Sequence, residues 1–444
     1  MWRALLTTML LIPTAVAQIL PGPGGSLLPG RLPGVGLPVP QQTLPSLTQP
    51  LNDQVRRLEE ARKLKIRDLL HRYPRLIEAD PNGNPIVRDE VLALGPSDAA
   101  LARAGSAGFA VVRVRSLAGL GIRLLILRTP VGTSTSRALR ELRRFDPAGT
   151  YDFNHIYTDS GEPVEGSGRP GLQDEAGPAV RAQGALASQK VVLGLIDGGV
   201  DVAQPLFQGE LIQQHGCAGA RVPSAHGTAV ASLMIGRATQ FAGASPGALL
   251  YAADVYCGKP TGGAVDAIAA AFAWMVREGV PVINVSLVGP PNALLQQVVD
   301  RVLSGGSLVV AAVGNDGPAA PPLYPAAYPG VIGVTAVDAK HRVLFEAERG
   351  PQVMFAAPGA DIEAARVPRG LAAVRGTSFA APLVAGLLAQ QLHRPDPGSA
   401  RMAVKDLISR AIHLGASGRN SVYGYGLVAA HLPARSGQGA TASD

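Results

Sequence analysis

The chain is poor in cysteine and in charged residues. Two cysteines, Cys217 and Cys257, occur among 444 residues, and neither lies in a C-x-x-C pair, so we expect no metal site built from these two side chains alone. Charged residues form 16% of the chain, against 47% hydrophobic residues. This composition is too apolar for an intrinsically disordered protein and predicts a large buried core.

The N-terminus has the pattern of a cleaved signal peptide. Met1-Trp2-Arg3 precedes an apolar run over residues 4–12 and then Ala15-Val16-Ala17, a small-x-small cleavage site. A membrane anchor is the alternative, but the run is shorter than the ~20 residues that a spanning helix needs, and Pro13 follows it. We therefore predict a signal peptide over 1–17 and an exported protein, periplasmic or extracellular.

No later segment has the pattern of a transmembrane anchor. The apolar stretches near 265–289 and 302–313 are interrupted by charges, Gly or Pro, which fits a buried sheet better. Export to an oxidising compartment would allow Cys217 and Cys257 to form a disulfide.

A net charge of +7 raises the alternative of a nucleic-acid partner. The basic clusters, Arg56-Arg57 and residues 140–144, lie on helix-like segments with interleaved Leu and Glu. This pattern favours a solvated helix face, so we expect no nucleic-acid partner.

Besides the signal peptide, four segments lie outside the two predicted domains. The second of them contains an amphipathic helix over 51–73, which Pro74 ends and whose role the sequence does not reveal. The segments are a Pro/Gly-rich linker (18–50), the helical segment (51–84), a connecting segment (158–187) that is rich in Gly, Pro and Ala and expected to be exposed over 161–187, and a polar tail (433–444).

Residues 85–157 have the rhythm of a small α+β domain. The expected elements are a strand over 86–94, a helix after Ser97, a strand pair over 109–128, a helix over 134–145 and an extended piece over 150–157. Their order, βαββαβ, matches the split βαβ architecture.

Residues 188–432 predict a large α/β domain. Nearly continuous apolar strands alternate with helical stretches, which indicates a mostly parallel sheet covered by helices on both faces. Active sites in such sheets lie at the carboxyl ends of the strands.

Four polar residues occur at element ends in this domain. Asp197 ends the strand run 191–196, and Asn315 follows the run 308–313; His226 and Ser378 begin helical stretches. Each alone is typical of an ordinary turn or helix cap. Together they place an acid, a base, a nucleophile and an amide donor at one edge of the sheet.

The segments around these residues resemble the four signature blocks of the subtilisin-like serine proteases. The blocks are Leu195-Ile196-Asp197-Gly198, His226-Gly227-Thr228-Ala229-Val230-Ala231, Val313-Gly314-Asn315-Asp316-Gly317 and Gly376-Thr377-Ser378-Phe379-Ala380-Ala381-Pro382. Subtilisin itself has the chain order Asp, His, Ser, so this order belongs to the resemblance. The resemblance covers roughly residues 188–432.

The resemblance implies a serine endopeptidase that forms an acyl-enzyme on extended polypeptides. Ser378 would attack the scissile carbonyl, His226 would transfer the proton, and Asp197 would orient the imidazole. Asn315 would donate to the oxyanion. No cofactor is required for this chemistry. The family often binds structural calcium, but no acidic loop of this sequence places a site.

The resemblance also implies a substrate-binding edge and a primary pocket. Ser286 and Leu287 would pair with the substrate backbone. Val288 stands where the family usually has glycine, so the specificity does not transfer, although we expect small or medium apolar side chains in the pocket. The remaining expected substrate-binding residues are Gly289, Gly314, Asp316 and Leu323.

Enzymes of this family commonly carry an N-terminal prodomain that blocks the cleft. Residues 85–157 match its βαββαβ order, so we expect an intramolecular inhibitor whose last strand, 150–157, lies in the active site. The resemblance implies a monomeric zymogen that is cleaved near Tyr157 or elsewhere before residue 188.

Three other functions compete with this interpretation. A catalytically silent relative would keep the fold for binding or regulation, but none of the key residues is missing. An α/β-hydrolase esterase requires a Gly-x-Ser-x-Gly elbow and the order Ser, acid, His, whereas Ser378 lies in Gly-Thr-Ser-Phe-Ala and comes last. A basic surface-binding protein would leave the triad unexplained.

Overall fold

A computed structural model of the chain describes residues 49–163, 190–239 and 241–432. The predicted signal peptide, almost all of the predicted linker, most of the connection and the polar tail lie outside these ranges. Among the described helices, none has both the length and the apolar character to span a membrane.

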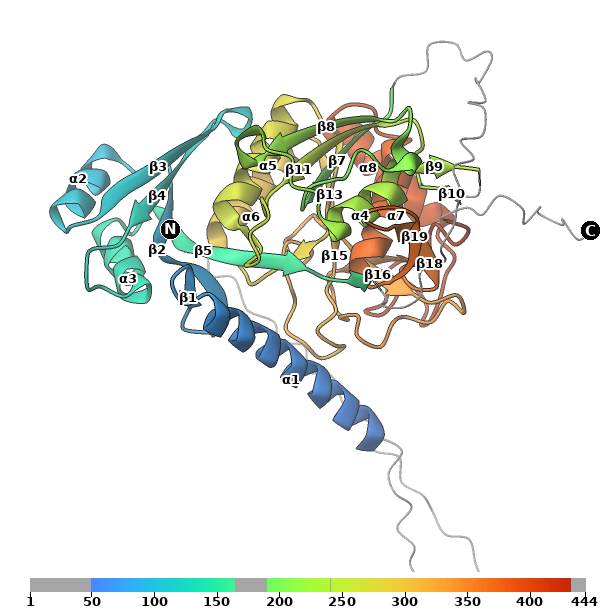
Figure 1. Cartoon of the computed structure of the whole chain (residues 1–444), viewed down its shortest axis with the longest axis horizontal. Coiled ribbons are helices and arrows are strands. Elements are labelled where there is room, and N and C mark those ends of the chain that lie inside the picture. Colours follow the sequence, from blue (N-terminus) through green and yellow to red (C-terminus); the bar gives the residue numbers. More distant parts are fainter. Residues whose placement is uncertain (1–48, 164–189, 240, 433–444) are drawn as a thin grey trace, which may run out of the picture. The chain divides into compact units, whose positions relative to one another are not determined.

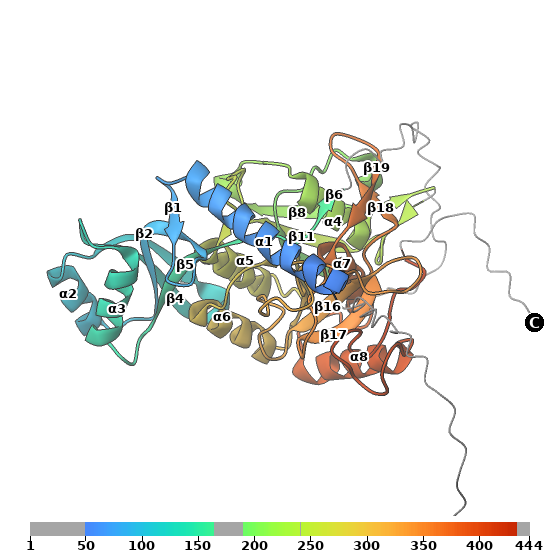
Figure 2. The same cartoon turned by 90° about the horizontal axis from the view of Figure 1, so that it is seen from below.

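The first described element is the helix α1 (Gln49–Arg72), which was expected from the sequence. It ends two residues before Pro74, whose ring disfavours a helical conformation in the preceding residue. Figure 2 shows α1 as a straight blue helix in front of the large domain.

The small α+β domain follows in the predicted βαββαβ order, with one added short strand, β1 (Ile77–Ala79). Strands β2, β4 and β3 form an antiparallel sheet, and α2 and α3 accompany it (Figure 1). Alternate strand residues such as Val91 and Leu125 pack with Leu139 of α3. The bounds are β2 Pro85–Leu94, α2 Asp98–Ser106, β3 Ala110–Leu117, β4 Ile122–Arg128, α3 Thr135–Phe145 and β5 Thr150–Asp159.

The large domain contains a seven-stranded sheet in the order β17-β16-β15-β13-β7-β11-β8, and every neighbouring pair is parallel. This confirms the predicted α/β class. The strands are β7 Val192–Asp197, β8 Leu211–Gly216, β11 Leu249–Asp254, β13 Val282–Val285, β15 Leu308–Ala312, β16 Ile332–Val337 and β17 Val353–Pro358.

Helices cover both faces of this sheet. One apolar core joins the sheet to α4 (Ala225–Ile235), α7 (Thr377–Ala389) and α8 (Pro397–Arg410). A second core joins its other face to α5 (Val265–Arg277) and α6 (Ala293–Ser304). The helix α7 is buried along nearly its whole length, as its uniformly apolar sequence requires.

The strand β5 connects the two domains and extends further than the sequence predicted. It pairs antiparallel with β12 (Gly263–Ala264) and β14 (Leu287–Val288) of the large domain, and it ends at Asp159, not at residue 157. The chain continues into β6 (Glu162–Pro163), which pairs with β19 (Leu371–Arg375). The predicted connecting segment 158–187 thus begins with backbone groups that find partners on strand edges of the large domain.

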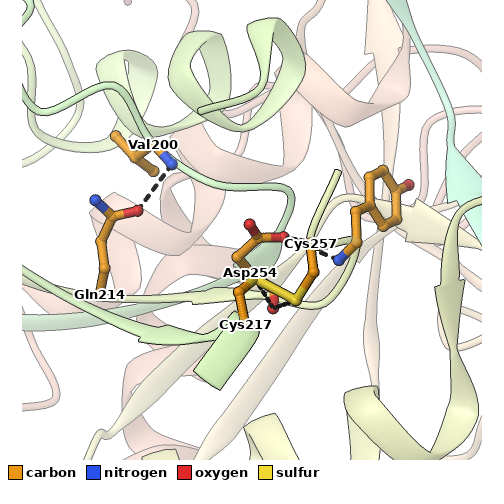
Figure 3. The surroundings of a disulfide bond; sticks show 6 residues. Val200, Gln214, Cys217, Asp254 and Cys257 are labelled. Carbon is orange, nitrogen blue, oxygen red and sulfur yellow. Dashed lines mark hydrogen bonds between the residues drawn. A yellow bond between two sulfur atoms is a disulfide. The ribbon is translucent and has the colours of Figure 1, made fainter. Parts of the chain in front are cut away.

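The two cysteines form a disulfide. Cys217 follows β8, and Cys257 lies in the loop after β11 (Figure 3). The bond joins the ends of two neighbouring parallel strands, and Asp254 lies beside it. Both cysteines have φ near +51°.

Candidate active site

Asp197 and His226 are brought together at the carboxyl end of β7. His226 lies in the first turn of α4, whose N-cap, Ser224, accepts a hydrogen bond from the Gly227 amide at 2.9 Å. The His226 Nδ1 lies 2.9 and 3.0 Å from the two carboxylate oxygens of Asp197. The carboxylate of Asp197 is completely buried and also accepts from the Gly198 amide at 2.6 Å.

Electrostatics favour a charged imidazole at this position. Burial lowers the pKa of His226, but the charge and hydrogen bond of Asp197, followed by the charge of Asp159, outweigh it and raise the pKa to about 9. Burial raises the pKa of Asp197, an effect that the neighbouring His226 opposes. The pair therefore stabilises a proton on the imidazole.

Ser378 lies in the first turn of α7, directly after the strand β19. Gly376 caps this helix at φ 138°, a backbone conformation that favours glycine. The Ser378 hydroxyl donates to the carbonyl of Ser286 at 3.1 Å. The buried His226 Nε2 has no hydrogen-bond partner among the described residues, so it is available to a serine hydroxyl that rotates toward it.

Asn315 is held by the start of α7. Its Oδ1 accepts a hydrogen bond from the Thr377 amide at 3.1 Å, which fixes the opposite, donating end of the side chain. That end, Nδ2, donates to the carbonyl oxygen of Ser160. The Ser378 amide donates to the same oxygen at 3.4 Å. Two donors therefore converge on one peptide carbonyl.

Ser160 lies against Ser378 in the buried centre of the cleft. Its amide donates to the Ser378 Oγ at 3.2 Å, and the two hydroxyl oxygens are 2.6 Å apart. Only 4% of Ser160 is exposed. The arrangement places a hydroxyl, a histidine–carboxylate pair and two hydrogen-bond donors around the peptide bond between Ser160 and Gly161, which is a constellation suited to acyl transfer.

Comparisons with known proteins agree with this geometry. The family model of the subtilase family matches residues 188–426. The chain belongs to the subtilase family. Subtilisin amylosacchariticus from Bacillus subtilis subsp. amylosacchariticus is 32% identical over 314 residues, which cover 67% of this chain and 78% of that protein. Membership of this family supports the assignment of the chain as a serine peptidase. Subtilases act on peptides and need no cofactor for catalysis.

Two further relatives bear on this subtilase. The minor extracellular protease Epr from Bacillus subtilis (strain 168) is 30% identical over 207 residues, covering 46% of this chain and 32% of that protein. The solved structure of fervidolysin from Fervidobacterium pennivorans, described as a keratinolytic enzyme related to subtilisin, has a TM-score of 0.63. The matched region is 80% of this chain and 61% of the fervidolysin chain. At 21% sequence identity, this similarity supports the fold.

The predicted substrate-binding edge of this subtilase contacts the β5 strand. Leu287 pairs with Asp159 and Val288 with Thr158, antiparallel. Gly289 faces Tyr157: a Cβ built on Gly289 would lie 2.6 Å from the ring. Val288, which replaces the glycine usual in the family, thus still pairs through its backbone with Thr158 of β5.

Ser286 was predicted to pair with the substrate backbone, and in the structure its side chain contacts Ser378. Its side chain donates to the carbonyl of Ser378 at 2.9 Å and accepts from Asn284 at 2.9 Å. Ser286 is buried and directly precedes β14, whose pairing with β5 covers Leu287 and Val288. Its side chain contacts Ser378, the proposed nucleophile.

The remaining predicted pocket residues are Gly314, Asp316 and Leu323, and each lies beside an ionisable side chain. Asp316 forms an ion pair with Arg62 of α1, 2.9 Å between Nε and Oδ2. Leu323 donates its amide to Glu348 at 3.1 Å, and a Cβ built on Gly314 would lie 2.8 Å from Glu348 Oε1. Burial, followed by the charge of Asp316, raises the pKa of Glu348 to about 9.

Sequence reasoning did not find Glu348, Ser160 or Tyr256. The Tyr256 hydroxyl donates to Asp159 at 2.5 Å, and the two residues are almost one hundred positions apart. None of the three belongs to a family signature block, and their contacts depend on how β5 enters the cleft. The position of Ser160, three residues after Tyr157, was the one available signal.

One group of three metal-ligand types occurs within the described ranges: Cys217, Asp254 and Cys257. The two sulfurs are joined in the disulfide and offer no thiolate to a metal. The structure therefore does not place the structural calcium that the family resemblance allows.

Proposed function

We propose that this subtilase is an exported serine endopeptidase made as a zymogen, and that the first bond it cleaves is its own Ser160–Gly161 bond. One observation carries the proposal: the Ser160 carbonyl oxygen accepts hydrogen bonds from Asn315 and from the Ser378 amide, with the Ser378 hydroxyl beside it. A carbonyl in this position is bound as a substrate is bound. The bond lies three residues beyond Tyr157.

The proposed reaction uses Asp197, His226 and Ser378 as the triad. The Ser378 hydroxyl turns from Ser286 toward His226 Nε2, gives up its proton there and attacks the Ser160 carbonyl carbon. Asn315 and the Ser378 amide hold the resulting oxyanion. Asp197 stabilises the imidazolium, as its two short contacts with Nδ1 allow.

Collapse of this intermediate breaks the C–N bond between Ser160 and Gly161. His226 returns the proton to the leaving amine of Gly161, and Ser378 retains an ester with the Ser160 carbonyl. A water molecule, deprotonated by His226, then hydrolyses the ester and leaves a carboxylate on Ser160. The same cycle would cleave peptide substrates that replace the β5 segment.

After cleavage, the domain ending at Ser160 would remain as an inhibitor. Tyr157 is completely buried, and its hydroxyl donates to the Pro290 carbonyl at 2.6 Å. The carboxylate of Asp152 accepts from the Ala293 amide at 2.7 Å, at the positive N-terminal end of α6. These contacts do not involve Gly161, so cleavage leaves them intact.

The helix α1 supports the same inhibitory role, which the sequence left open. Arg62 pairs with Asp316. A Cβ built on Gly317 would lie 3.3 Å from the Leu58 Cδ1. A pocket of about 940 Å³ is lined by residues of both α1 and the cleft, including Lys65, Ile66, Ser160, Val288 and Asn315. We include residues 49–160 in the inhibitory part.

Export rests on three supporting facts. The N-terminal 17 residues have the signal-peptide pattern, although they lie outside the described residues. The disulfide suits an oxidising compartment. A relative carries the name extracellular protease.

The proposal is tested with Ser378→Ala in the full secreted chain. We expect the variant to remain a single intact polypeptide and to hydrolyse no casein, whereas the wild type splits into two fragments and gains activity. Ser409→Ala, on the exposed side of α8, is the matched control and should behave as the wild type. Hydrolysis by Ser378→Ala at the wild-type rate would refute the proposal.

A further inference from the structure

The residue before Ser160 makes a specific side-chain contact. The Tyr256 hydroxyl donates to the Asp159 Oδ1 at 2.5 Å. The backbone pairing of Asp159 with Leu287 is available to any residue, but this contact requires an acceptor on the side chain. Asp159 is the penultimate residue on the acyl side of the bond proposed for cleavage.

The loop that carries Tyr256 is fixed in place. The Asp254 Oδ1 accepts the amides of Tyr256 and Cys257 at 2.9 and 2.8 Å. The disulfide ties Cys257 to Cys217 at the end of β8 (Figure 3). The hydroxyl is therefore held at one place beside the scissile bond, which is a requirement for a group that discriminates among substrates.

The Tyr256 hydroxyl is also fixed as a donor. Burial, followed by the charges of Asp159 and Asp197, raises its pKa well above the ordinary value, so the proton stays on the oxygen. The charge of Asp159 also raises the pKa of Asp197, since the two carboxylates repel each other. An acidic penultimate residue is thus unfavourable here unless a donor such as Tyr256 offsets the repulsion.

The residue after the scissile bond is confined as well. A Cβ built on Gly161 would lie 2.8 Å from the Phe379 Cε2 and 3.3 Å from the Arg375 carbonyl oxygen. Phe379 is completely buried and packs against the His226 ring, 5.4 Å between centroids. Because Phe379 has little room to move, a side chain at position 161 would clash with its ring.

We propose that Tyr256 and Phe379 determine specificity: Tyr256 selects a carboxylate on the penultimate acyl-side residue, and Phe379 selects glycine immediately after the scissile bond. The preferred substrates are extended peptides containing Asp-x-Gly, with cleavage before the glycine. This inference rests on the proposed endopeptidase function and names its substrate class. The cleaved segment Asp159-Ser160-Gly161 is the internal example.

Quenched fluorescent peptides test the proposal with the processed wild-type enzyme. The parent peptide contains Tyr-Thr-Asp-Ser-Gly-Glu, as in residues 157–162. One analogue has Asn in place of Asp, and a second has Ala in place of Gly. We expect kcat/KM for each analogue to be at least about tenfold lower, because Asn weakens a charge-assisted hydrogen bond and the Ala methyl group collides with Phe379.

Tyr256→Phe provides the second arm. It should cleave the Asp peptide at least about tenfold more slowly but the Asn peptide less than about threefold more slowly, because a neutral amide oxygen forms a weaker hydrogen bond with the hydroxyl than a carboxylate does. Tyr423→Phe removes a hydroxyl in the C-terminal segment and is the control. Hydrolysis of the Asn peptide by all three enzymes shows that each is folded and active.

The outcomes separate the two proposals. Equal cleavage of the Asp and Asn peptides by the wild type overturns the role of Tyr256, and equal cleavage of the Gly and Ala peptides overturns that of Phe379. Neither result affects the endopeptidase proposal. If no peptide is hydrolysed by a chain that retains Ser378, the endopeptidase proposal itself fails.

Discussion

Arg62 of α1 forms an ion pair with Asp316, the residue that directly follows Asn315. Both side chains are about three-quarters buried, at 24% and 26% exposure. The helix thus contacts the large domain beside the donor that holds the Ser160 carbonyl. A charge-dependent contact at this place affects how firmly the inhibitory part stays bound after cleavage.

Reversing the charge of Arg62 should weaken this inhibition. Arg62→Glu places a carboxylate next to Asp316 and Glu348, and we expect a loss of roughly 1 to 2 kcal/mol, or about a 5- to 30-fold weaker inhibition of the processed enzyme. The measurement is peptidase activity of the cleaved but unseparated complex. Arg56→Glu is the control, because Arg56 pairs with Asp53 on the same helix. Equal inhibition in both variants would contradict a role for α1.

Self-cleavage should accelerate as the pH rises. The proposed base is neutral His226, and its pKa of about 9 in the precursor means that the imidazole is mostly protonated at pH 7. We expect the first-order rate of self-cleavage to increase nearly tenfold per pH unit below 9 and to level off above it. Stopped samples on a gel give the rate.

Asp159→Asn should move this profile toward lower pH. The Asp159 charge is one of the causes that raise the pKa of His226, together with Asp197, while Lys65 acts in the opposite direction. Removing the charge lowers that pKa, so the base becomes neutral earlier. Asp98→Asn, at the exposed start of α2, should leave the profile unchanged. A midpoint that does not move in Asp159→Asn would show that its charge does not reach His226.

Asn315→Ala should slow self-cleavage by about 10² to 10³, the usual cost of losing one oxyanion donor. The Asn315 amide donates to the Ser160 carbonyl and is oriented by the Thr377 amide. The expected loss is in the single-turnover rate, with the precursor still folded. Asn82→Ala, in an exposed turn, is the comparison. A change below about fivefold would argue that Asn315 does not hold the oxyanion.

Glu348→Gln should make stability less sensitive to alkaline pH. The pKa of this buried carboxyl is raised to about 9 from an ordinary value of 4.5. Its stabilising contribution is complete below pH 4.5 and declines as the pH rises toward 9, because the folded state holds a proton that the unfolded state releases. Gln keeps the shape and needs no proton. Melting temperatures from pH 6 to 9 should fall less in the variant, and parallel curves would contradict this assignment.

The parts of the fold that the sequence predicted depend on local signals. Strand ends at Asp197 and helix starts at His226 and Ser378 follow from apolar runs and caps that lie within a few residues. The βαββαβ order of the small domain follows from the same periodicities. These features therefore required no knowledge of distant contacts.

The parts that could not be predicted depend on contacts between distant residues. Ser160 meets Ser378 across 218 positions of the chain, and Tyr256 meets Asp159 across 97. The segment 158–163 is short, and its polar, Gly and Pro residues are typical of a loop. It is extended because it pairs with strand edges of the large domain. The hydrogen bond from the Ser286 side chain to the Ser378 carbonyl likewise depends on the position of α7, 92 residues later in the chain.

Mass spectrometry of the secreted protein tests the proposed self-cleavage most directly. We expect two fragments from one precursor, one with Ser160 as its last residue and one with Gly161 as its first, and neither should form in Ser378→Ala. Ends at Ser160 and Gly161 would show that the carbonyl bound by Asn315 and Ser378 is the one attacked. A mature enzyme that begins at any other residue, with no Gly161 intermediate early in the time course, would contradict the proposed mechanism.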